Sequence, residues 1–344
     1  MKYPCIEVDL SKIKYNTKKV LDSTAKHGIN ISCVTKVVAG DKKIMETVID
    51  AGVYNLADSR IANFKNFIGD KVKKLLIRIP MESEAEEVVL ECDATLISEL
   101  ETAKKLSEYC EKHSKLIDVI LMFDLGDLRE GCFDIEDLIN TAKVINSLPH
   151  INLFGIGSNF ACYGGIKPTI KNLTQLCEAK TILERELNIE LSVVSPGSSN
   201  CLHLLGEMPS CINHLRVGST IFCGTGLNDV VLDGYYYDIF KLKAQIVELK
   251  TKPSVPIGES CLNAFGKEVK FEDKGEILRA IVAVGRQDVD IEELIPIDNN
   301  IEILGSSSDH IVLEVPSYYK LGDIITFNLT YPGCLKSMTS KYLY

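Results

Sequence analysis

The stretch Ile31-Ser-Cys-Val-Thr-Lys36-Val-Val-Ala-Gly-Asp41 contains the structural unit from which most of this chain is built. Its apolar, β-branched first half is typical of a buried strand that ends at Lys36. Asp41 then stands where an N-cap would begin the helix that apolar periodicity predicts over 41–51. The stretch therefore predicts one strand followed at once by one helix.

The same strand-and-helix unit recurs through the first two thirds of the sequence. Further strands are predicted at 54–58, 74–79, 94–98, 117–124, 152–159, 191–196 and 214–218. The intervening segments with helical periodicity are 59–67, 82–91, 99–112, 134–147 and 168–187. Asp58, Ser98 and Asp134 are candidate N-caps for three of them. Such an alternation over roughly 190 residues predicts an α/β fold, a (β/α)8 barrel. An open doubly wound sheet is the alternative, although no Gly-x-Gly-x-x-Gly opens a helix.

The two ends of the chain differ from this alternation. An opening strand-and-helix pair, Ile6-Glu-Val-Asp-Leu10 and then 11–27, precedes the first unit. In the last third, alternating apolar and polar residues predict strands at 241–250, 277–285, 301–304, 310–315 and 323–329. We therefore expect two domains, a barrel over 1–225 and a small all-β domain over 226–344.

The charge of the chain argues against two classes of partner. The 344 residues include 38 Lys plus Arg and 48 Asp plus Glu, which gives a formal net charge of −10, and they contain no Lys/Arg run. Such a chain is poorly suited to nucleic acid or to an anionic membrane surface, so we expect neither and look for small-molecule chemistry. The sequence contains no apolar run of about 18 residues, so we expect no transmembrane helix. Its N-terminal segment lacks the apolar core of a secretory signal.

The twelve cysteines are scattered singly, and no two have Cys-x-x-Cys spacing. Most lie in apolar stretches, where a free cysteine behaves as a small hydrophobic residue. We therefore expect a cytoplasmic protein with reduced cysteines and no structural zinc.

Chemistry in a barrel collects where the strands lead into the following loops. Lys36 ends the first strand, and a lysine in apolar surroundings is costly unless its amine is neutral or paired. It is either a Schiff-base lysine for an aldehyde cofactor or a lysine that reaches out to water. Arg129 lies between Gly126 and Gly131 after the fifth strand, as a guanidinium held over the barrel mouth or as an ordinary surface arginine.

Small and hydroxyl-bearing residues follow the last three strands. They form the sequences Gly157-Ser-Asn159, Ser195-Pro-Gly-Ser-Ser-Asn200 and Arg216-Val-Gly-Ser-Thr220. The last two follow strands seven and eight, where barrels commonly bind phosphate through backbone N–H groups and hydroxyls. Each loop alone is also an ordinary turn, but together they favour a phosphate site. Arg216 points into the barrel and needs an acceptor such as a ring nitrogen or a carboxylate.

Three motifs, taken in their order along the chain, resemble those of the fold-type III pyridoxal-phosphate enzymes of the alanine racemase type. The resemblance covers nearly the whole chain. Lys36 is similar to their Schiff-base lysine. Asp124-x-Gly-x-x-Arg129-x-Gly131 is similar to the loop whose Arg orients the phenolate oxygen of the cofactor and the substrate carboxylate. His214-x-Arg216-Val-Gly218 resembles the strand whose Arg faces the pyridine nitrogen. The resemblance implies that pyridoxal 5'-phosphate is bound by Lys36, Asn159, Ser198, Ser199, Arg216, Gly218, Ser219 and Tyr342.

Shorter strings resemble the ornithine racemase branch of this family. They are LADSR (56–60), CYGG (162–165), GRQDVD (285–290) and SSDHIVLEV (307–315). The resemblance implies a racemase that interconverts L- and D-amino acids, with ornithine as the first choice, by two-base transfer of the α proton through an external aldimine. Asp288 or Asp290 would bind the distal ammonium of such a diamino acid.

The resemblance also implies that catalysis uses Lys36, Arg129 and a second base from the β domain of a partner subunit, so that a homodimer shares its active sites. The chain departs from the family at two places. The stretch 258–266 has no tyrosine for the second base, and Cys261 is either a thiol in that role or a structural cysteine. Gly40 stands near where the racemases have a tyrosine that contacts phosphate.

Two alternative functions remain: a metal-dependent lyase of the same fold, and a non-catalytic cofactor carrier. D-threonine aldolase and D-serine dehydratase need a metal beside the cofactor, but Asp309-His310 has no evident third ligand, so we expect no metal. A non-catalytic cofactor carrier would leave the Arg129 loop and the second domain unexplained. Metal dependence distinguishes the lyases, and retained cofactor without α-proton exchange distinguishes the carrier.

Overall fold

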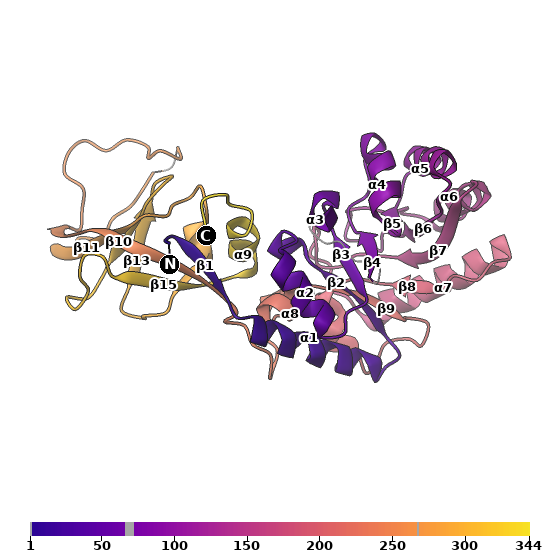
Figure 1. Ribbon diagram of the computed structural model, residues 1–344, viewed down its shortest axis with the longest axis horizontal. Coiled ribbons are helices and arrows are strands. Elements are labelled where there is room, and N and C mark those ends of the chain that lie inside the picture. The colour runs from indigo at the N-terminus through magenta and orange to yellow at the C-terminus, as the bar shows by residue number, and fades with distance from the viewer. Residues whose placement is uncertain (1, 66–71, 267) are drawn as a thin grey trace. The chain divides into compact units, whose positions relative to one another are not determined.

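The computed structural model describes residues 2–65, 72–266 and 268–344. The chain forms two compact units. One unit is Leu10–Tyr237, and the other combines the segment before Leu10 with Asp238–Tyr344. Figure 1 shows the second unit mainly in orange and yellow, with the indigo β1 among its strands.

Eight parallel strands form the sheet of the larger unit, in the order β8-β7-β6-β5-β4-β3-β2-β9. They are β2 (Asn30–Val34), β3 (Asn55–Asp58), β4 (Lys73–Leu76), β5 (Ala94–Ile97), β6 (Ile117–Met122), β7 (Ile151–Gly157), β8 (Val193–Ser195) and β9 (His214–Val217). The two ends of this order also meet, because Ser198 forms a parallel bridge with Arg216. The N–H of Arg216 donates to the carbonyl of Gly197 over 2.9 Å. The predicted barrel is therefore confirmed, and the alternative of an open sheet is wrong.

Helices alternate with these strands. They are α1 (Leu10–Ala25), α2 (Lys42–Asp50), α3 (Ile61–Lys65), α4 (Ala85–Glu91), α5 (Leu100–His113), α6 (Ile135–Ser147), α7 (Ile170–Leu187) and α8 (Ser219–Cys223). Asp41 and Asp134 cap α2 and α6, each accepting a bond from the N–H three residues on, at 3.0 and 2.8 Å. The predicted cap Ser98 is wrong, because α5 begins one residue later and Glu99 takes the cap position. The end of the predicted helix 59–67 lies outside the described residues.

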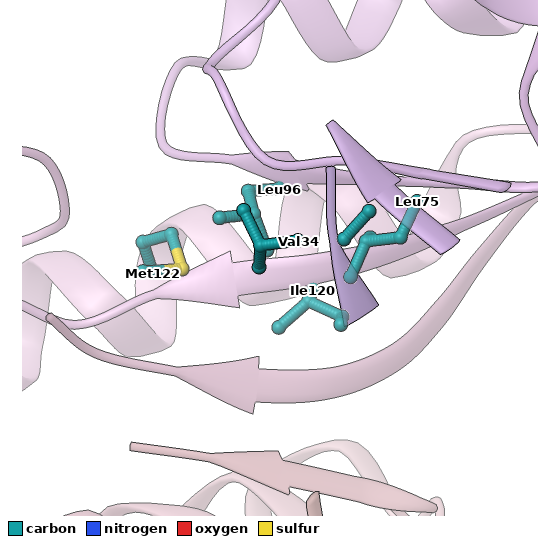
Figure 2. Close-up of a cluster of buried hydrophobic side chains, with 6 residues drawn as sticks. Val34, Leu75, Leu96, Ile120 and Met122 are labelled. Atoms are coloured by element: carbon teal, nitrogen blue, oxygen red, sulfur yellow. The ribbon is translucent and has the colours of Figure 1, made fainter. Parts of the chain in front are cut away.

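A cluster of apolar side chains from β2 to β6 forms part of the barrel core (Figure 2). Its members are at most 7% exposed: Val34, Ala57, Leu75, Leu96, Ile120 and Met122. Neighbouring parallel strands contribute one or two residues each, which is how buried parallel sheets fill their interior. Removal of this apolar surface from water stabilises the scaffold that carries the loops.

The smaller unit is built on an antiparallel sheet. Its strands run in the order β12-β15-β10-β11-β14-β13, and β1 pairs with β10. Their bounds are β1 (Cys5–Val8), β10 (Phe240–Pro253), β11 (Glu276–Val282), β12 (Leu294–Pro296), β13 (Glu302–Ser306), β14 (Ile311–Glu314) and β15 (Ile324–Leu329). A short helix, α9 (Tyr331–Ser337), follows the last strand. The predicted C-terminal β structure is thus confirmed.

The position of the first strand differs from expectation. We expected residues 1–225 to form one domain, with the opening strand beside the barrel. Instead β1 runs antiparallel to β10, with Cys5 opposite Lys243 and Val8 opposite Phe240. The eight parallel strands close without β1, so its backbone hydrogen bonds are made in the other sheet, and the change of unit falls after Asp9 and after Tyr237.

One pair of cysteines also departs from expectation. We expected all cysteines to be reduced, but Cys177 of α7 and Cys211 form a disulfide. Their Cα atoms are 6.1 Å apart, within the range that a disulfide requires. Residues 34 positions apart in sequence meet here because α7 and the segment before β9 are neighbours in the fold, so the prediction is wrong for this pair.

Leu96→Ala should destabilise the barrel by about 2–5 kcal/mol, because Leu96 is 1% exposed and its truncation leaves a cavity. Urea unfolding followed by circular dichroism measures this change. Leu116→Ala is the control: that side chain is 63% exposed, so its loss should change the free energy of unfolding by no more than about 0.5 kcal/mol. Equal effects of the two substitutions would contradict the assignment of Leu96 to the core.

Candidate active site

Most of the candidate residues lie at one end of the barrel. Lys36 begins a short 3₁₀ segment, Lys36–Val38, directly after β2. The others follow or end later strands: Arg129 after β6, Asn159 after β7, Ser198 and Ser199 after β8, Arg216 in β9, and Gly218 and Ser219 at the start of α8. Because the carboxyl ends of parallel strands meet at one end of a barrel, these residues from distant parts of the sequence form one cluster.

The Lys36 amine lies in a partly buried position. Burial is the largest influence and lowers the pKa of this amine from its ordinary value. The positive charge of Arg129 lowers this pKa further, whereas the carboxylates of Asp58 and Glu130 raise it. A lysine whose pKa is lowered has more of the neutral amine that attacks an aldehyde.

The backbone around Lys36 is held by a buried carboxylate. Asp58 is 0% exposed and accepts bonds from Thr35 Oγ1 at 2.7 Å, from the N–H of Arg60 at 2.9 Å and from Asn63 Nδ2 at 2.9 Å. We expected Asp58 to cap a helix, but its side chain instead joins β3 to the residue before Lys36. Its place at the end of a predicted strand was the signal for this role in the sequence.

Gly40 explains one departure from the family pattern. Its φ is +64°, in the left-handed region that favours glycine. A Cβ added here would lie 2.7 Å from both the Cβ and the carbonyl oxygen of Asn63. A tyrosine at this position is therefore excluded by the close approach of Asn63 on α3.

The Arg129 loop is shaped by Asp124 at the end of β6. One carboxylate oxygen of Asp124 accepts bonds from the N–H groups of Gly126 and Leu128, at 2.9 and 3.1 Å. Gly131 has φ +132°, and a Cβ there would lie 2.7 Å from the backbone nitrogen of Asp124. This close approach accounts for the glycine that ends the motif.

Arg129 is paired with its neighbour. The guanidinium donates to both carboxylate oxygens of Glu130. Glu130 also accepts a bond from Asn159 Nδ2 at 2.8 Å. Glu130 lies inside a recognised motif, at a position where the motif specifies no residue type, and sequence reasoning did not single it out.

Arg216 is a buried cation held by neutral acceptors. The residue is 3% exposed, and burial lowers the pKa of its guanidinium to about 10, so it stays charged at neutral pH. Nη1 donates to the carbonyl and hydroxyl oxygens of Ser195, at 3.3 and 3.0 Å. Nη2 donates to the carbonyl of Ser158 at 2.6 Å and to Asn159 Oδ1 at 2.9 Å. None of these four bonds goes to a carboxylate.

The two serine loops are joined to each other. The Ser199 hydroxyl accepts bonds from the N–H groups of Gly218 and Thr220, at 3.3 and 3.2 Å. The Ser198 hydroxyl accepts from the N–H of Asn200 at 3.3 Å. A Cβ added to Gly218 would lie 3.1 Å from the carbonyl oxygen of Val34, so the chain passes close to β2 here. Hydroxyls and backbone N–H groups of both loops are thereby gathered in one place.

This donor set fits an aldehyde cofactor with a ring nitrogen and a phosphate. Lys36 supplies an amine of lowered pKa. Arg216 supplies a charged donor without a carboxylate partner. Ser198 and Ser199 supply hydroxyls for an anion beside the start of α8. Pyridoxal phosphate has the complementary groups.

The other candidate residues lie in the smaller unit. Cys261 is exposed, and its thiol donates to the carbonyl of Leu262 at 3.4 Å. Asp288 is buried and accepts a bond from the Ser340 hydroxyl at 2.6 Å. Asp290 pairs with Lys336 at 2.8 Å and with Arg286 at 3.6 Å. Tyr342 is exposed near the C-terminus.

Over 2–65, 72–266 and 268–344, no group of three or more His, Cys, Asp or Glu side chains is arranged to hold a metal ion. In the same part of the chain, no helix is long and apolar enough to span a membrane.

Comparison with known proteins gives matches over the whole chain. Residues 8–226 match the family model of the alanine racemase N-terminal domain. The ornithine racemase of Acetoanaerobium sticklandii is 43% identical over 99% of this chain and 98% of its own length. The lysine racemase of Thermotoga maritima is 39% identical over 100% of this chain and 98% of its own length.

Solved structures share the fold at lower identity. The alanine racemase of Bacillus anthracis superimposes with a TM-score of 0.77 at 16% identity, covering 100% of this chain and 94% of that one. The D-threonine aldolase of Filomicrobium marinum gives 0.72 at 12% identity, covering 98% and 89%. The fold is thus common to racemases and lyases, whereas the sequence matches over full length are racemases. The chain belongs to the alanine racemase family and is an amino-acid racemase.

Proposed function

We propose that this protein interconverts L- and D-ornithine with pyridoxal 5'-phosphate as cofactor. The observation that supports it most is the combination, at one barrel end, of a lysine of lowered pKa and a buried arginine whose four described hydrogen bonds all go to neutral oxygens. The full-length relative that is an ornithine racemase supports the choice of substrate. When bound, the cofactor withdraws electrons from the substrate and acidifies its α proton.

Each residue of the barrel cluster has a distinct part in this proposal. Lys36 attaches the cofactor and then moves the α proton on one face of the substrate. Arg129 orients the substrate carboxylate and the phenolate oxygen of the cofactor, and Arg216 faces the ring nitrogen with Asn159 beside it. The phosphate is held by Ser198, Ser199, Gly218, Ser219 and Tyr342.

A racemase needs a second acid or base on the opposite face of the substrate. We assign this part to Cys261 from the β unit of a partner subunit, in a homodimer. Its exposure supports the assignment, because a thiol that serves another subunit must be accessible. Asp288 or Asp290 of the same unit would bind the distal ammonium of the substrate.

Incubation of the cofactor-loaded protein in deuterated water should give α-deuterated D-ornithine from L-ornithine, without added metal. L-Lysine, L-alanine and D-serine are tested in parallel, each with and without chelator. Proton NMR follows α-deuteration, and chiral chromatography follows the D isomer. Keto acid or aldehyde that disappears with chelator would identify a metal-dependent lyase instead, and retained cofactor without exchange would identify a carrier.

Lys36→Ala should abolish the visible absorbance of the lysine-bound cofactor and lower racemisation by about 10²–10⁴-fold or more, because attachment and one proton transfer are both lost. Absorption spectra and chiral assays measure the two effects. Lys42→Ala is the matched control, since that side chain is 69% exposed and lies on helix α2. An unchanged spectrum in Lys36→Ala would exclude Lys36 as the attachment point.

Cys261→Ala should slow α-proton exchange from one enantiomer about 10²-fold more than from the other, because each base serves one face. Deuterium exchange with L- and D-ornithine, measured separately, gives the ratio. Cys162→Ala is compared in the same assay, since Cys162 is a cysteine of the barrel unit that lies near Lys36. If only Cys162→Ala gives the one-sided loss, the second base lies in the barrel unit, and the assignment to Cys261 is wrong.

A further inference from the structure

The hydrogen bonds of Arg216 continue into the barrel beyond Ser195. The Ser195 hydroxyl lies 3.0 Å from Arg216 Nη1 and also 3.0 Å from His214 Nδ1. His214 Nε2 in turn lies 2.9 Å from the Ser32 hydroxyl on β2. Ser195 is 0%, Ser32 2% and His214 7% exposed. Four buried side chains from three strands thus form one continuous chain of hydrogen bonds.

The chemistry of these groups sets the direction of each bond. A guanidinium has only donors, so Arg216 must donate to Ser195. The Ser195 proton then has one acceptor in the described part of the chain, which is His214 Nδ1. The imidazole must therefore carry its proton on Nε2 and donate it to Ser32. The opposite tautomer would direct two donors at Ser195 and leave its buried hydroxyl proton without an acceptor.

The charge state of His214 agrees with this arrangement. Burial, and then the positive charge of Arg216, lowers the pKa of the imidazole to about 3. A neutral ring keeps the lone pair on Nδ1 that the Ser195 proton needs. The Ser32 end of the chain borders a cavity of about 330 Å³ with polar lining groups that include Asn30, Asn55 and Asn213. The chain of hydrogen bonds therefore ends at Ser32, beside this cavity.

We propose that His214 and Ser195 are positioning residues that aim the guanidinium of Arg216 at the ring nitrogen of the cofactor. This inference rests on the proposed function, which places the ring nitrogen opposite Arg216. The imidazole fixes the Ser195 hydroxyl with its lone pairs toward Nη1. The backbone and Asn159 hold Nη2. Neutral groups that bind Nη1 and Nη2 thus fix the plane of the guanidinium, and its positive charge remains available to the ligand.

The first test reads the tautomer directly in the full-length chain, with and without pyridoxal phosphate. Long-range nitrogen–proton NMR on histidine-labelled protein distinguishes the two tautomers of a neutral ring, and the signal missing in His214→Asn assigns the residue. We expect one neutral ring protonated on Nε2, and a mixture of tautomers in Ser195→Ala. A ring protonated on Nδ1 in the wild type would overturn the inference.

The second test compares two replacements of His214. In His214→Asn, the side-chain oxygen can still accept the Ser195 proton, whereas His214→Leu is apolar and cannot. Partners that orient the ligands of a metal typically contribute about 10–100-fold to affinity or activity, and we use the lower end of this range for the partners of Arg216. We therefore expect His214→Leu to weaken binding of pyridoxal phosphate by about tenfold, to shift its visible absorbance and to lower kcat with little change in KM. His214→Asn should restore most of each quantity.

Ser107→Ala is the control for general loss of stability. Ser107 is 5% exposed and donates to the carbonyl of Pro149, remote from the chain that ends at Arg216. It should leave the absorbance and affinity of the cofactor unchanged. Equal cofactor affinity, absorbance and kcat in His214→Leu and His214→Asn would overturn the inference. If His214→Leu does not fold, the tautomer of His214 in Ser195→Ala is the deciding measurement. Absence of α-proton exchange in the wild type would overturn the proposed function alone, because the tautomer and cofactor affinity do not depend on turnover.

Discussion

The buried positive charge of Arg216 is the constraint on which the rest of this site depends. A charge removed from water is costly unless hydrogen bonds and a compensating group are present. Arg216 has four hydrogen bonds to neutral oxygens and none to a carboxylate. These bonds satisfy Nη1 and Nη2, and within the described part of the chain no carboxylate forms a hydrogen bond with the guanidinium. A bound ligand with an acceptor at this position would complete the arrangement, which explains why three loops converge on it.

The barrel supplies the geometry that this constraint needs. Ser158 directly follows β7 and Ser195 ends the neighbouring strand β8, and Arg216 reaches both from β9 because the sheet closes between β8 and β9. On the opposite side of β9, β2 leads into Lys36, so the amine and the guanidinium are carried by adjacent strands. An open sheet would separate β8 from β9, and Arg216 would lose its Ser195 contacts.

Periodicity and turn residues were enough to predict the eight barrel strands, because each carries the same apolar signal and meets its neighbour in sequence order. The four residues of β1 carry the same local signal, but their partner β10 lies more than 200 positions away, and no local pattern indicates that choice. Asp58, Glu130 and the His214–Ser195 contact were missed for the same reason. Their partners come from other strands, and their residue types also suit caps and loops.

The net charge of −10 and the proposed phosphate site are compatible because the two act over different distances. Exposed charges farther apart than about 10 Å are largely screened by salt, whereas charges in a partly buried mouth are not. Arg129 and Arg216 bring two guanidinium groups to this end of the barrel, where the Lys36 amine has a lowered pKa. Glu130 is the carboxylate that acts on both Lys36 and Arg216, and Arg129 already holds it. Since Arg129 already donates to both carboxylate oxygens of Glu130, a substrate carboxylate that binds Arg129 must compete with Glu130 for the guanidinium.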